Sequence, residues 1–591
     1  MSEATYVKGG SFLVEDTTPD DVFTPEDFSS EQLQFAKTAR DFIDNEVLPR
    51  SDAIEAKEPG VVPELMRKAG ELGLLMADVP EEYGGLGLDK ASSALITENM
   101  SGQGSFSVAF GAHVGIGTLP IVYYGTEEQK KKYLPGLADG TTIGCYCLTE
   151  PTSGSDALSI RTKAVLSEDG THYVLNGTKQ FITNGGIAQV FIVFAKVDGE
   201  HFTGFVLDKD TPGLKVGPEE HKMGILGSST TTVILEDARV PKENVLGEVG
   251  QGHKIAFNIL NIGRFKLGAG AVGSAKRALD QALAYALERK QFGRRIAEFG
   301  AIREKLANMF ARIYAAESAV YRTVGLIDRL HAASGGGHGE TALKAIEEYS
   351  VECAVVKVHG SEVLDYVVDE TVQILGGYGY CAEYPAERYY RDSRINRIFE
   401  GTNEINRLLV PGMLLRKAMK GELPLFQAAK ALQEELMGIP SLDMEPELGL
   451  LDPEKKIVAN LKKICLFVAG VAAQKHGKAL AEQQPVLMRL ADLAIHAYVA
   501  ESTVLRALKD AARRGEDKAA LPLAAARIVC EEAASGAEAV AREALAALET
   551  GDTLATMLAA LRRLVRRTPA DTVAQREIIA SRLVEMERVV L

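Results

Sequence analysis

Cysteine is scarce in this sequence and follows no ligand pattern. The 591 residues include six cysteines, and no two of them are spaced as CxxC. This spacing argues against a zinc ribbon and against a disulfide framework, and it favours a reducing compartment. We therefore predict no metal site and no disulfide scaffold.

Targeting signals, long apolar runs and a positive net charge are missing as well. Residues 1–16 are acidic and lack a basic stretch followed by an apolar one, so neither a secretory signal nor a transit peptide is predicted. No uninterrupted apolar run reaches the roughly 20 residues that span a bilayer. The formal charge of −15 disfavours a broad nucleic-acid surface. We expect a soluble cytoplasmic protein that binds no nucleic acid.

The remaining composition, 46% hydrophobic and 25% charged, is that of a globular protein. A chain of this length is expected to form several domains. The apolar period is helical in residues 24–141, typical of short strands in residues 142–250, and helical again in residues 251–420. Residues 421–451 are acidic and punctuated by prolines, and we interpret them as a linker. Residues 452–591 are helical and rich in alanine.

These segments predict an α+β fold that is mainly helical. An N-terminal helical domain precedes a middle β-barrel-like domain, a helical bundle domain follows, and an extra C-terminal helical domain completes the chain. In the middle domain, short β-rich runs such as Val190 to Val197 alternate with turn signals at Asn176-Gly177, Asp198-Gly199 and Pro212-Gly213.

One glycine motif is typical of nucleotide sites but has the wrong context here. Gly268 to Gly273 match GxGxxG, which a dinucleotide fold places directly after a strand. In this chain the motif lies within a helical run that continues to Arg289. We therefore interpret its small residues as a site of close helix packing, and we predict no nicotinamide site.

Three other segments carry groups that could serve a site, although each has an ordinary explanation. Residues 146–156 gather hydroxyls and amides that can donate to a flavin or a phosphate, but a capped turn explains them equally well. Residues 180–186 could stack on a ring, or simply close a strand in a turn. Glu400 stands between an apolar run and a glycine, where desolvation would raise its basicity. A solvated or ion-paired glutamate is the more frequent case.

Taken together, five segments resemble the acyl-CoA dehydrogenase family. They are EPTSGSD at residues 150–156, FITNGG at 181–186, ERKQFG at 288–293, QILGGYGY at 373–380 and RIFEGTNEI at 397–405. The resemblance covers about residues 28–420. Two further segments, ILNIGRF at 259–265 and LMRLADLAI at 487–495, resemble the very-long-chain branch, which carries an extra C-terminal helical domain.

The resemblance implies an FAD enzyme that converts a fatty acyl-CoA to its trans-2,3-enoyl-CoA. Flavin and substrate would lie between the middle domain and the second helical domain, and part of the FAD would be bound across a homodimer interface. The implied FAD-binding residues are Tyr146, Leu148, Thr149, Ser155, Phe181, Ile182, Thr183, Arg289, Gln291, Phe292, Gln373, Gly377, Thr402 and Glu404. The implied substrate-binding residues are Ser155, Leu260, Asn261, Arg264 and Gly401.

The resemblance also assigns the catalytic base. Some members carry it immediately before the arginine that matches Arg264; this chain has Gly263 there, so Glu400 remains the candidate. Glu400 would remove the α-proton while the β-hydride passes to flavin N5, and its backbone N–H would help to stabilise the charge that develops on the thioester carbonyl. Glycines in residues 110–117, near the acyl pocket, could leave a deep channel or could serve helix packing. The C-terminal extension favours medium-to-long chains.

Electron-transferring flavoprotein is the implied electron acceptor. Four alternatives stay open: an enoyl-CoA reductase working in the reverse direction, an oxidase, a scaffold protein of the same fold without turnover, and a DNA-associated flavoprotein. The acidic charge and Glu400 argue against the last of these. A basic amphipathic segment at residues 554–567 could lie on a membrane surface. We expect instead a helix that faces the core, and no membrane contact.

Overall fold

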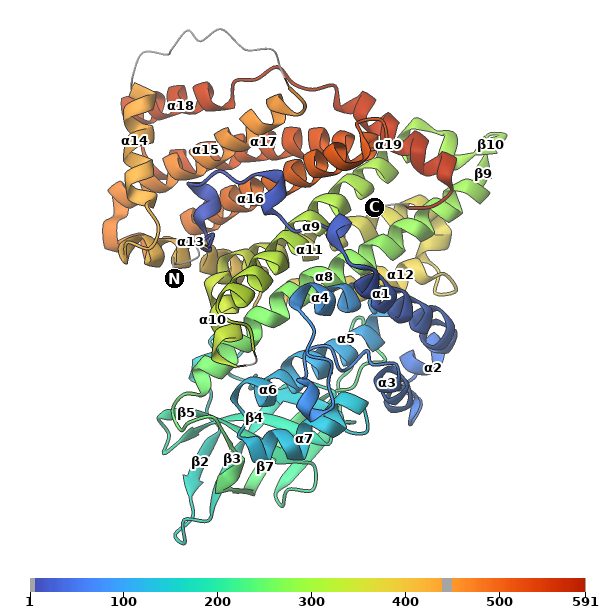
Figure 1. Ribbon diagram of the computed structural model, residues 1–591, viewed down its shortest axis with the longest axis vertical. Helices are drawn as coiled ribbons and strands as arrows, with labels where there is room; N and C mark the ends of the chain where they lie inside the picture. The colour runs from blue at the N-terminus through green and yellow to red at the C-terminus, as the bar shows by residue number, and fades with distance from the viewer. Residues whose placement is uncertain (1–5, 338, 438–448, 590–591) are drawn as a thin grey trace.

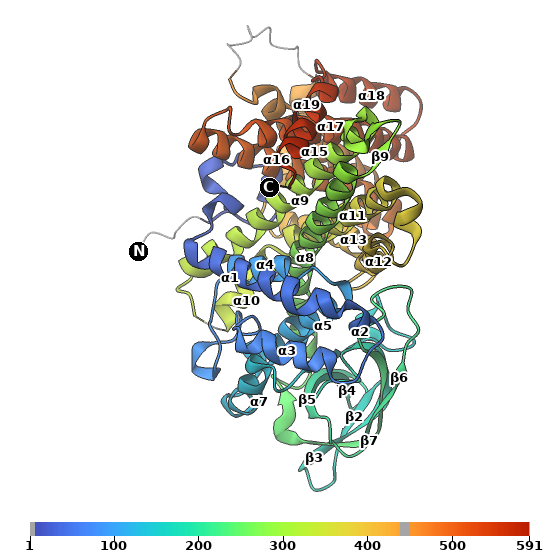
Figure 2. The same cartoon turned by 90° about the vertical axis from the view of Figure 1, so that its right-hand side faces the viewer.

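The structure, a computed structural model, describes residues 6–337, 339–437 and 449–589 (Figure 1). The elements follow the predicted order of helical, β, helical and again helical segments. In both views the sheet lies at one end of the molecule and the C-terminal helices lie at the other (Figure 1 and Figure 2). The long helices of the third segment connect the two ends.

The first helical segment lies between the sheet and these long helices (Figure 2). Its first helix begins after Ser29, where a reciprocal capping box with Gln32 satisfies two free backbone N–H groups. The helices are α1 (Ser30–Phe42), α2 (Ser51–Glu55), α3 (Val61–Glu71), α4 (Lys90–Asn99), α5 (Gly104–Ala112), α6 (Leu119–Tyr124) and α7 (Glu127–Asp139).

The middle segment forms one eight-stranded sheet that is strongly curved (Figure 2). Its strands are β1 (Gly144–Cys147), β2 (Lys163–Leu166), β3 (His172–Thr183), β4 (Val190–Val197), β5 (His201–Asp208), β6 (Leu214–Glu219), β7 (Thr230–Pro241) and β8 (Val245–Leu246). The order is β6-β7-β3-β2-β4-β5-β8, and β1 pairs with β4 in parallel. A buried apolar cluster that includes Phe191, Phe205 and Val233 fills the sheet's inner face.

The predicted turn at Asn176-Gly177 is wrong, because both residues lie inside β3. The register with β7 shifts between Leu175 and Gly177, so the pair marks a β-bulge. A Cβ on Gly177 would lie 2.7 Å from Thr162 Cα, and the glycine therefore serves a close approach of two backbones. The turns predicted at 198–199 and 212–213 are confirmed, since they precede β5 and β6.

The third segment is a bundle of long helices. It contains α8 (Gly252–Glu288), the short strands β9 (Lys290–Gln291) and β10 (Arg294–Arg295), α9 (Gly300–Ala333), α10 (Glu340–Glu348), α11 (Ser350–Leu375), α12 (Pro385–Ser393) and α13 (Asn403–Met419). The GxGxxG motif lies within α8, as predicted. A Cβ on Gly273 would lie 1.9 Å from the carbonyl oxygen of Glu98 on α4, and one on Gly268 would lie 3.2 Å from that of Val356 on α11. The motif therefore serves close helix packing.

The predicted linker contains a helix, α14 (Leu425–Met437). Pro424 precedes its first residue, and a proline at that point is compatible with helix initiation, so the proline signal was misinterpreted as a break. Leu432 of α14 is buried. The linker prolines Pro440 and Pro446 lie outside the described residues.

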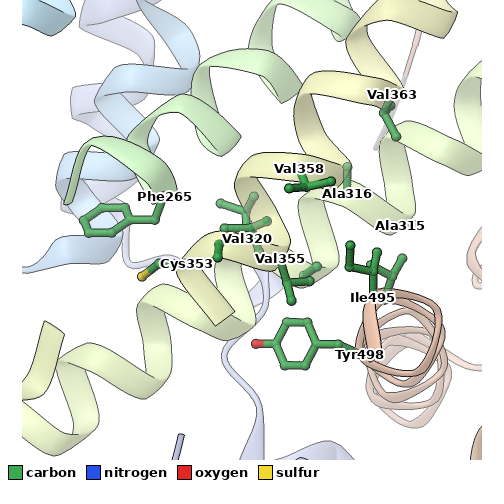
Figure 3. Packing of buried hydrophobic residues seen from close by; sticks show 14 of the residues in the cluster. Phe265, Ala315, Ala316, Val320, Cys353, Val355, Val358, Val363, Ile495 and Tyr498 are labelled. Carbon is green, nitrogen blue, oxygen red and sulfur yellow. The ribbon is translucent and has the colours of Figure 1, made fainter. Parts of the chain in front are cut away.

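The C-terminal extension packs onto the catalytic bundle through one shared core. Its helices are α15 (Asp452–His476), α16 (Gln484–Arg514), α17 (Ala520–Leu548), α18 (Gly551–Val565) and α19 (Thr572–Met586). Figure 3 shows Ile495 and Tyr498 of α16 facing Ala315 of α9 and Val355 of α11. The apolar side of α18 contacts this core, with Leu561 and Leu564 buried and Arg562 exposed, so the core-facing interpretation is confirmed.

Residues 6–23 were not assigned by sequence, and residues 24–28 were predicted as the start of the helical domain; together they form a strap along the extension (Figure 1). Arg506 of α16 makes an ion pair with Glu26 at 2.8 Å. Lys509 donates to the carbonyl oxygen of Val22 at 2.7 Å, and Lys462 to that of Glu15 at 2.8 Å. Residues 6–28 therefore fix the extension against the bundle.

Two helical segments, Gly104–Tyr124 and Asp452–Glu482, are long and apolar enough to cross a membrane by composition alone. Burial inside the molecule covers 78% and 56% of their most apolar windows. Core helices of this kind account for the pattern.

Candidate active site

Glu400 lies in a strained loop directly before α13. Its φ is 56° and that of Gly401 is 77°, so both residues adopt the left-handed conformation. This conformation costs a non-glycine residue roughly 1–2 kcal/mol, and the surrounding contacts must hold it. Asn406 Nδ2 donates to the carbonyl oxygens of Gly401 at 2.8 Å and of Thr402 at 3.1 Å. Lys357 Nζ on α11 donates to the Gly401 carbonyl at 2.8 Å.

The carboxyl group of Glu400 is desolvated and points at α8. Its Oε2 atom is buried and finds no hydrogen-bond partner among the described residues. A Cβ on Gly263 would lie 2.5 Å from this oxygen, so a side chain at this position would displace the carboxyl group. Burial raises the pKa of Glu400 to about 7, although the charges of Arg264 and Lys357 oppose the shift. A carboxylate with this pKa is suited to accept a proton near neutral pH.

Two buried cations flank the carboxylate without forming an ion pair with it. Arg264 Nη1 donates to Asn261 Oδ1 at 2.6 Å, and Arg264 Nε has no partner in the described part of the chain. Burial lowers the pKa of Arg264, while Glu400 acts to raise it. Burial likewise lowers the pKa of Lys357 to about 8. The positive charges of Arg264 and Lys357 thus lie next to the carboxyl group of Glu400.

The predicted substrate residues are partly brought together. Asn261 and Arg264 are buried on α8, and a Cβ on Gly401 would lie 3.9 Å from Arg264 Nη2. Leu260 is half-buried one turn before Arg264. Ser155 is exposed on the loop after β1 and is not among the residues that line the cavity at Glu400.

A cavity opens beside Glu400 and follows α8. Its empty volume, including the opening to solvent, is about 1140 Å³. On α8 it is lined from Gly263 to Arg277, and α5 contributes Gly111 on the opposite side. A Cβ at Gly111 or Gly115 would meet no described atom within 4 Å, whereas one at Gly117 would lie 2.7 Å from Gly144. Gly111 and Gly115 therefore leave open space, and only Gly117 of these three serves packing.

The residues predicted to bind flavin from the middle domain are only partly brought to this cavity. Thr183, at the end of β3, lines it. Tyr146 on β1 is buried, its hydroxyl lacks a partner within the described ranges, and its pKa is raised well above the usual value by burial and by the nearby Glu400. Phe181 is 63% exposed with φ of 59°, so its ring is presented to solvent. Leu148 and Ile182 are buried, and Thr149 is half-buried.

The remaining predicted cofactor residues form a second group. Arg289, Gln291, Phe292 and Gly377 line another pocket, of about 1180 Å³, which as described shares no lining residue with the first. Phe292 is 93% exposed, and Gln373 is exposed on α11 nearby in sequence. Thr402 caps α13 by accepting from Ile405 N at 3.2 Å, and Glu404 is exposed. Neither of these two lines either pocket in the described chain.

These observations fit a flavin. Glu400 and Thr183 line one cavity, and the buried Tyr146 hydroxyl, which interacts electrostatically with Glu400, has no hydrogen-bond partner among the described residues. The exposed ring of Phe292 lines the second pocket, where it can stack on a planar group. The described ranges contain no group of three or more His, Cys, Asp or Glu placed to hold a metal ion.

Sequence reasoning missed Lys357 and Asn406, which hold the loop of Glu400. Lys357 interrupts an apolar run, Ala354-Val355-Val356-Lys357-Val358, on a helix. A lone lysine in such a run predicts a buried charge with a specific partner, so Lys357 could have been identified from the sequence. No signal identified the partner, because it lies 44 residues away along the chain.

Comparisons with known proteins agree with this geometry. Models of the acyl-CoA dehydrogenase N-terminal, middle and C-terminal domains match residues 29–141, 145–238 and 250–414, and a second C-terminal domain model matches residues 460–563. The chain is 56% identical over 584 residues to a probable acyl-CoA dehydrogenase of Bacillus subtilis (strain 168), covering 98% of each chain. It is 38% identical over 572 residues to the human mitochondrial very long-chain specific acyl-CoA dehydrogenase, covering 90% of this chain and 83% of that one.

A solved structure extends the likeness to three dimensions. The crystal structure of an acyl-CoA dehydrogenase complexed with FAD from Bacillus anthracis has a TM-score of 0.96 and 57% identity, covering 99% of this chain and 100% of that one. The extra C-terminal domain predicted from the resemblance is thus shared with close relatives. By sequence, domain order and fold, the chain belongs to the acyl-CoA dehydrogenase family.

Proposed function

We propose that this chain is an FAD-dependent dehydrogenase that converts a medium-to-long-chain fatty acyl-CoA to its trans-2,3-enoyl-CoA, with Glu400 as the base. The observation that carries the proposal is the Glu400 carboxyl at the wall of an open cavity, whose buried Oε2 has no hydrogen-bond partner among the residues that the structure describes. Its pKa of about 7 lets it be ionised at neutral pH while remaining basic enough to accept an α-proton.

Two groups of residues would hold the cofactor. Thr183 offers a hydroxyl at the cavity, and the exposed Phe181 ring and the buried Tyr146 hydroxyl would add contacts from β3 and β1. Arg289 and Phe292 offer a cation and an aromatic face at the second pocket. Bound FAD supplies a hydride acceptor, which side chains cannot provide. A homodimer in which the second pocket serves a partner's cofactor would explain why the two groups are separate in one chain.

The chain's own contribution to the reaction is positioning, proton transfer and electrostatics. Glu400 accepts the α-proton from a thioester held beside α8. Arg264 and Lys357 favour negative charge in the site, so they keep Glu400 ionised before the reaction and stabilise charge that develops on the substrate. The low dielectric of the buried site strengthens both effects.

The cavity supports a medium-to-long acyl chain. The α8 stretch that lines it, from Gly263 to Arg277, rises ~21 Å at about 1.5 Å per residue. A fully extended chain advances about 3.5 Å per three bonds, so this stretch matches ~18 bonds. The open space at Gly111 and Gly115 favours the deep-channel interpretation of these glycines over the packing one.

The physiological partners follow from the family and remain predictions. Electron-transferring flavoprotein is the proposed electron acceptor. The proposed assembly is a cytoplasmic homodimer, and the exposed side chains of Phe292 and Tyr380 are candidates for the interface between its subunits. Neither nucleic acid nor a membrane is expected to bind.

Anaerobic titration of the purified yellow protein with acyl-CoAs from four to twenty carbons tests the proposal. Bleaching of the flavin by a subset of lengths is the expected result and gives the chain-length preference. If no saturated acyl-CoA bleaches the flavin, the dehydrogenase proposal fails. Reoxidation of the reduced protein by an enoyl-CoA would then support the reductase alternative, and its absence the scaffold alternative.

A further inference from the structure

The C-terminal extension contacts the element that carries the catalytic loop. Helix α13 begins immediately after the loop of Glu400, and its Arg407 bridges two other helices. Arg407 Nε donates to Asp492 Oδ1 of α16 at 2.7 Å, and Arg407 Nη1 donates to Glu362 Oε1 of α11 at 2.7 Å. A second bond, from Nη2 to Glu362 Oε2 at 3.0 Å, makes the contact with Glu362 bidentate. Arg407 is therefore fixed on one side by the extension and on the other by the bundle.

From Glu362 the contacts continue to the catalytic loop. Asn403 Nδ2 donates to Glu362 Oε1 at 3.2 Å. Lys357 Nζ donates to Asn403 Oδ1 at 2.7 Å and to the carbonyl oxygen of Gly401 at 2.8 Å. Gly401 follows Glu400, and both residues hold a left-handed conformation that depends on these bonds.

The charges along this path alternate in sign, from Asp492 through Arg407 and Glu362 to Lys357 and finally Glu400. Ion pairs connect Asp492, Arg407 and Glu362, and the Asn403 amide, which donates to Glu362 and accepts from Lys357, continues the path to Lys357 and the Gly401 carbonyl. Burial protects the inner end from screening, because Lys357 and Asn403 are 0% and 2% exposed. The outer end is firm because α16 packs in the same apolar core as α11 (Figure 3).

We propose that Asp492 of the C-terminal extension is a positioning residue for the catalytic loop, acting through Arg407, Glu362, Asn403 and Lys357. The extension then completes the active site of its own subunit. The inference deepens the proposed function and rests on Glu400 being the base.

The decisive variant is Asp492→Asn, which keeps the side-chain shape and removes the charge at the far end of the path. Its matched control is Glu577→Gln. Glu577 of α19 accepts from Arg303 Nε of α9 at 3.0 Å, so it also ties the extension to the bundle. Among the described residues, no chain of side-chain hydrogen bonds or ion pairs leads from this pair to the loop. Both variants are compared as full-length, FAD-bound protein.

Two readouts separate positioning from a general loss of stability. The first is the limiting rate constant of flavin bleaching at saturating acyl-CoA. Asp492→Asn is expected to lower it about 3- to 10-fold with little change in the half-saturating concentration, and Glu577→Gln to leave it within twofold. The second is amide hydrogen exchange of peptides that cover residues 399–406, which should accelerate in Asp492→Asn alone.

A double-mutant cycle with Lys357→Met tests whether the effect passes through Lys357. Lys357→Met is expected to lower the bleaching rate about 10- to 100-fold by itself. In that background Asp492→Asn should change the rate less than twofold, because the path is already broken. If Lys357→Met does not fold, Arg407→Lys takes its place, since lysine cannot reach both carboxylates with the arginine fork.

The inference is overturned if Asp492→Asn matches both the wild type and Glu577→Gln in bleaching rate and in loop exchange. Multiplicative losses in the double variant would overturn the route through Lys357. Faster loop exchange in Asp492→Asn, together with a wild-type flavin that no acyl-CoA bleaches, would uphold the positioning role and refute the proposed reaction.

Discussion

Replacing the catalytic carboxyl should make this protein more stable at alkaline pH. Burial raises the pKa of Glu400 from 4.5 to about 7. Between these values the folded state binds more protons at this position than the unfolded state, so stability falls as the pH rises. The neutral Glu400→Gln variant has no such loss, because it never carries a buried charge.

The size of the effect follows from the pKa difference. At about 1.4 kcal/mol per pKa unit, the wild type loses about 3 kcal/mol of unfolding free energy between pH 4 and pH 8, relative to the variant. Near 60 °C unfolding entropy is about 2.1 cal/mol/K per residue, which gives ~1.2 kcal/mol/K for a chain of 591 residues that unfolds as one unit. The midpoint of Glu400→Gln should therefore exceed that of the wild type by about 3 °C at pH 8 and by almost nothing at pH 4.5.

Scanning calorimetry of both FAD-bound proteins at the two pH values measures this difference directly. Glu340→Gln is the control, because a side-chain hydrogen bond from Lys344 lowers the pKa of this exposed glutamate. That variant should gain no stability at pH 8. Equal midpoints for Glu400→Gln and wild type at pH 8 would refute the view that Glu400 is held as a desolvated carboxylate.

Three further outcomes are expected. The kcat/KM of acyl-CoA oxidation should rise with pH and level off above about 7, because only ionised Glu400 accepts the α-proton. A kcat/KM that does not change across that pH range in initial-rate assays would contradict Glu400 as the base. Gly111→Leu should fill the open channel and shift the preferred substrate to shorter acyl chains, while Gly412→Leu on the exposed side of α13 should not, as rates across a chain-length series will show. Gly273→Ala should cost about 1–3 kcal/mol in urea unfolding, because its Cβ would lie 1.9 Å from the carbonyl oxygen of Glu98, and an unchanged midpoint would contradict such tight packing.

Much of the fold could be predicted from periodicity alone. The change from a helical to a strand period near residue 142 and back near 251 matches the observed elements, because amphipathic segments reveal their buried face in sequence. Asn176-Gly177 was misinterpreted, since the same dipeptide suits a tight turn and a β-bulge, and only the partner strand decides between them. The strap of residues 6–28 has short 3-10 turns and no apolar period, so its contacts with α16 could not be anticipated.

The residues of the site could likewise be predicted only where the signal is local in sequence. Glu400 was predicted because its neighbours in sequence carry the motif, and Gly263 was predicted to leave the position of a base empty. The structure adds the reason, which is that Gly263 faces the Glu400 carboxyl itself. Lys357 and Asp492 were missed as functional residues, because their roles come from helices that meet only in the folded chain.

The central claim is that Glu400 removes the α-proton, and the reductive half-reaction of Glu400→Gln tests it most directly. Stopped-flow mixing of the FAD-bound variant with the best acyl-CoA substrate measures the rate of flavin bleaching under anaerobic conditions. The account predicts a variant that retains its FAD and binds the ligand but bleaches at least a thousandfold more slowly than wild type, in line with the loss of a catalytic base of this kind. Bleaching within tenfold of the wild-type rate would contradict it and would assign the base to another residue.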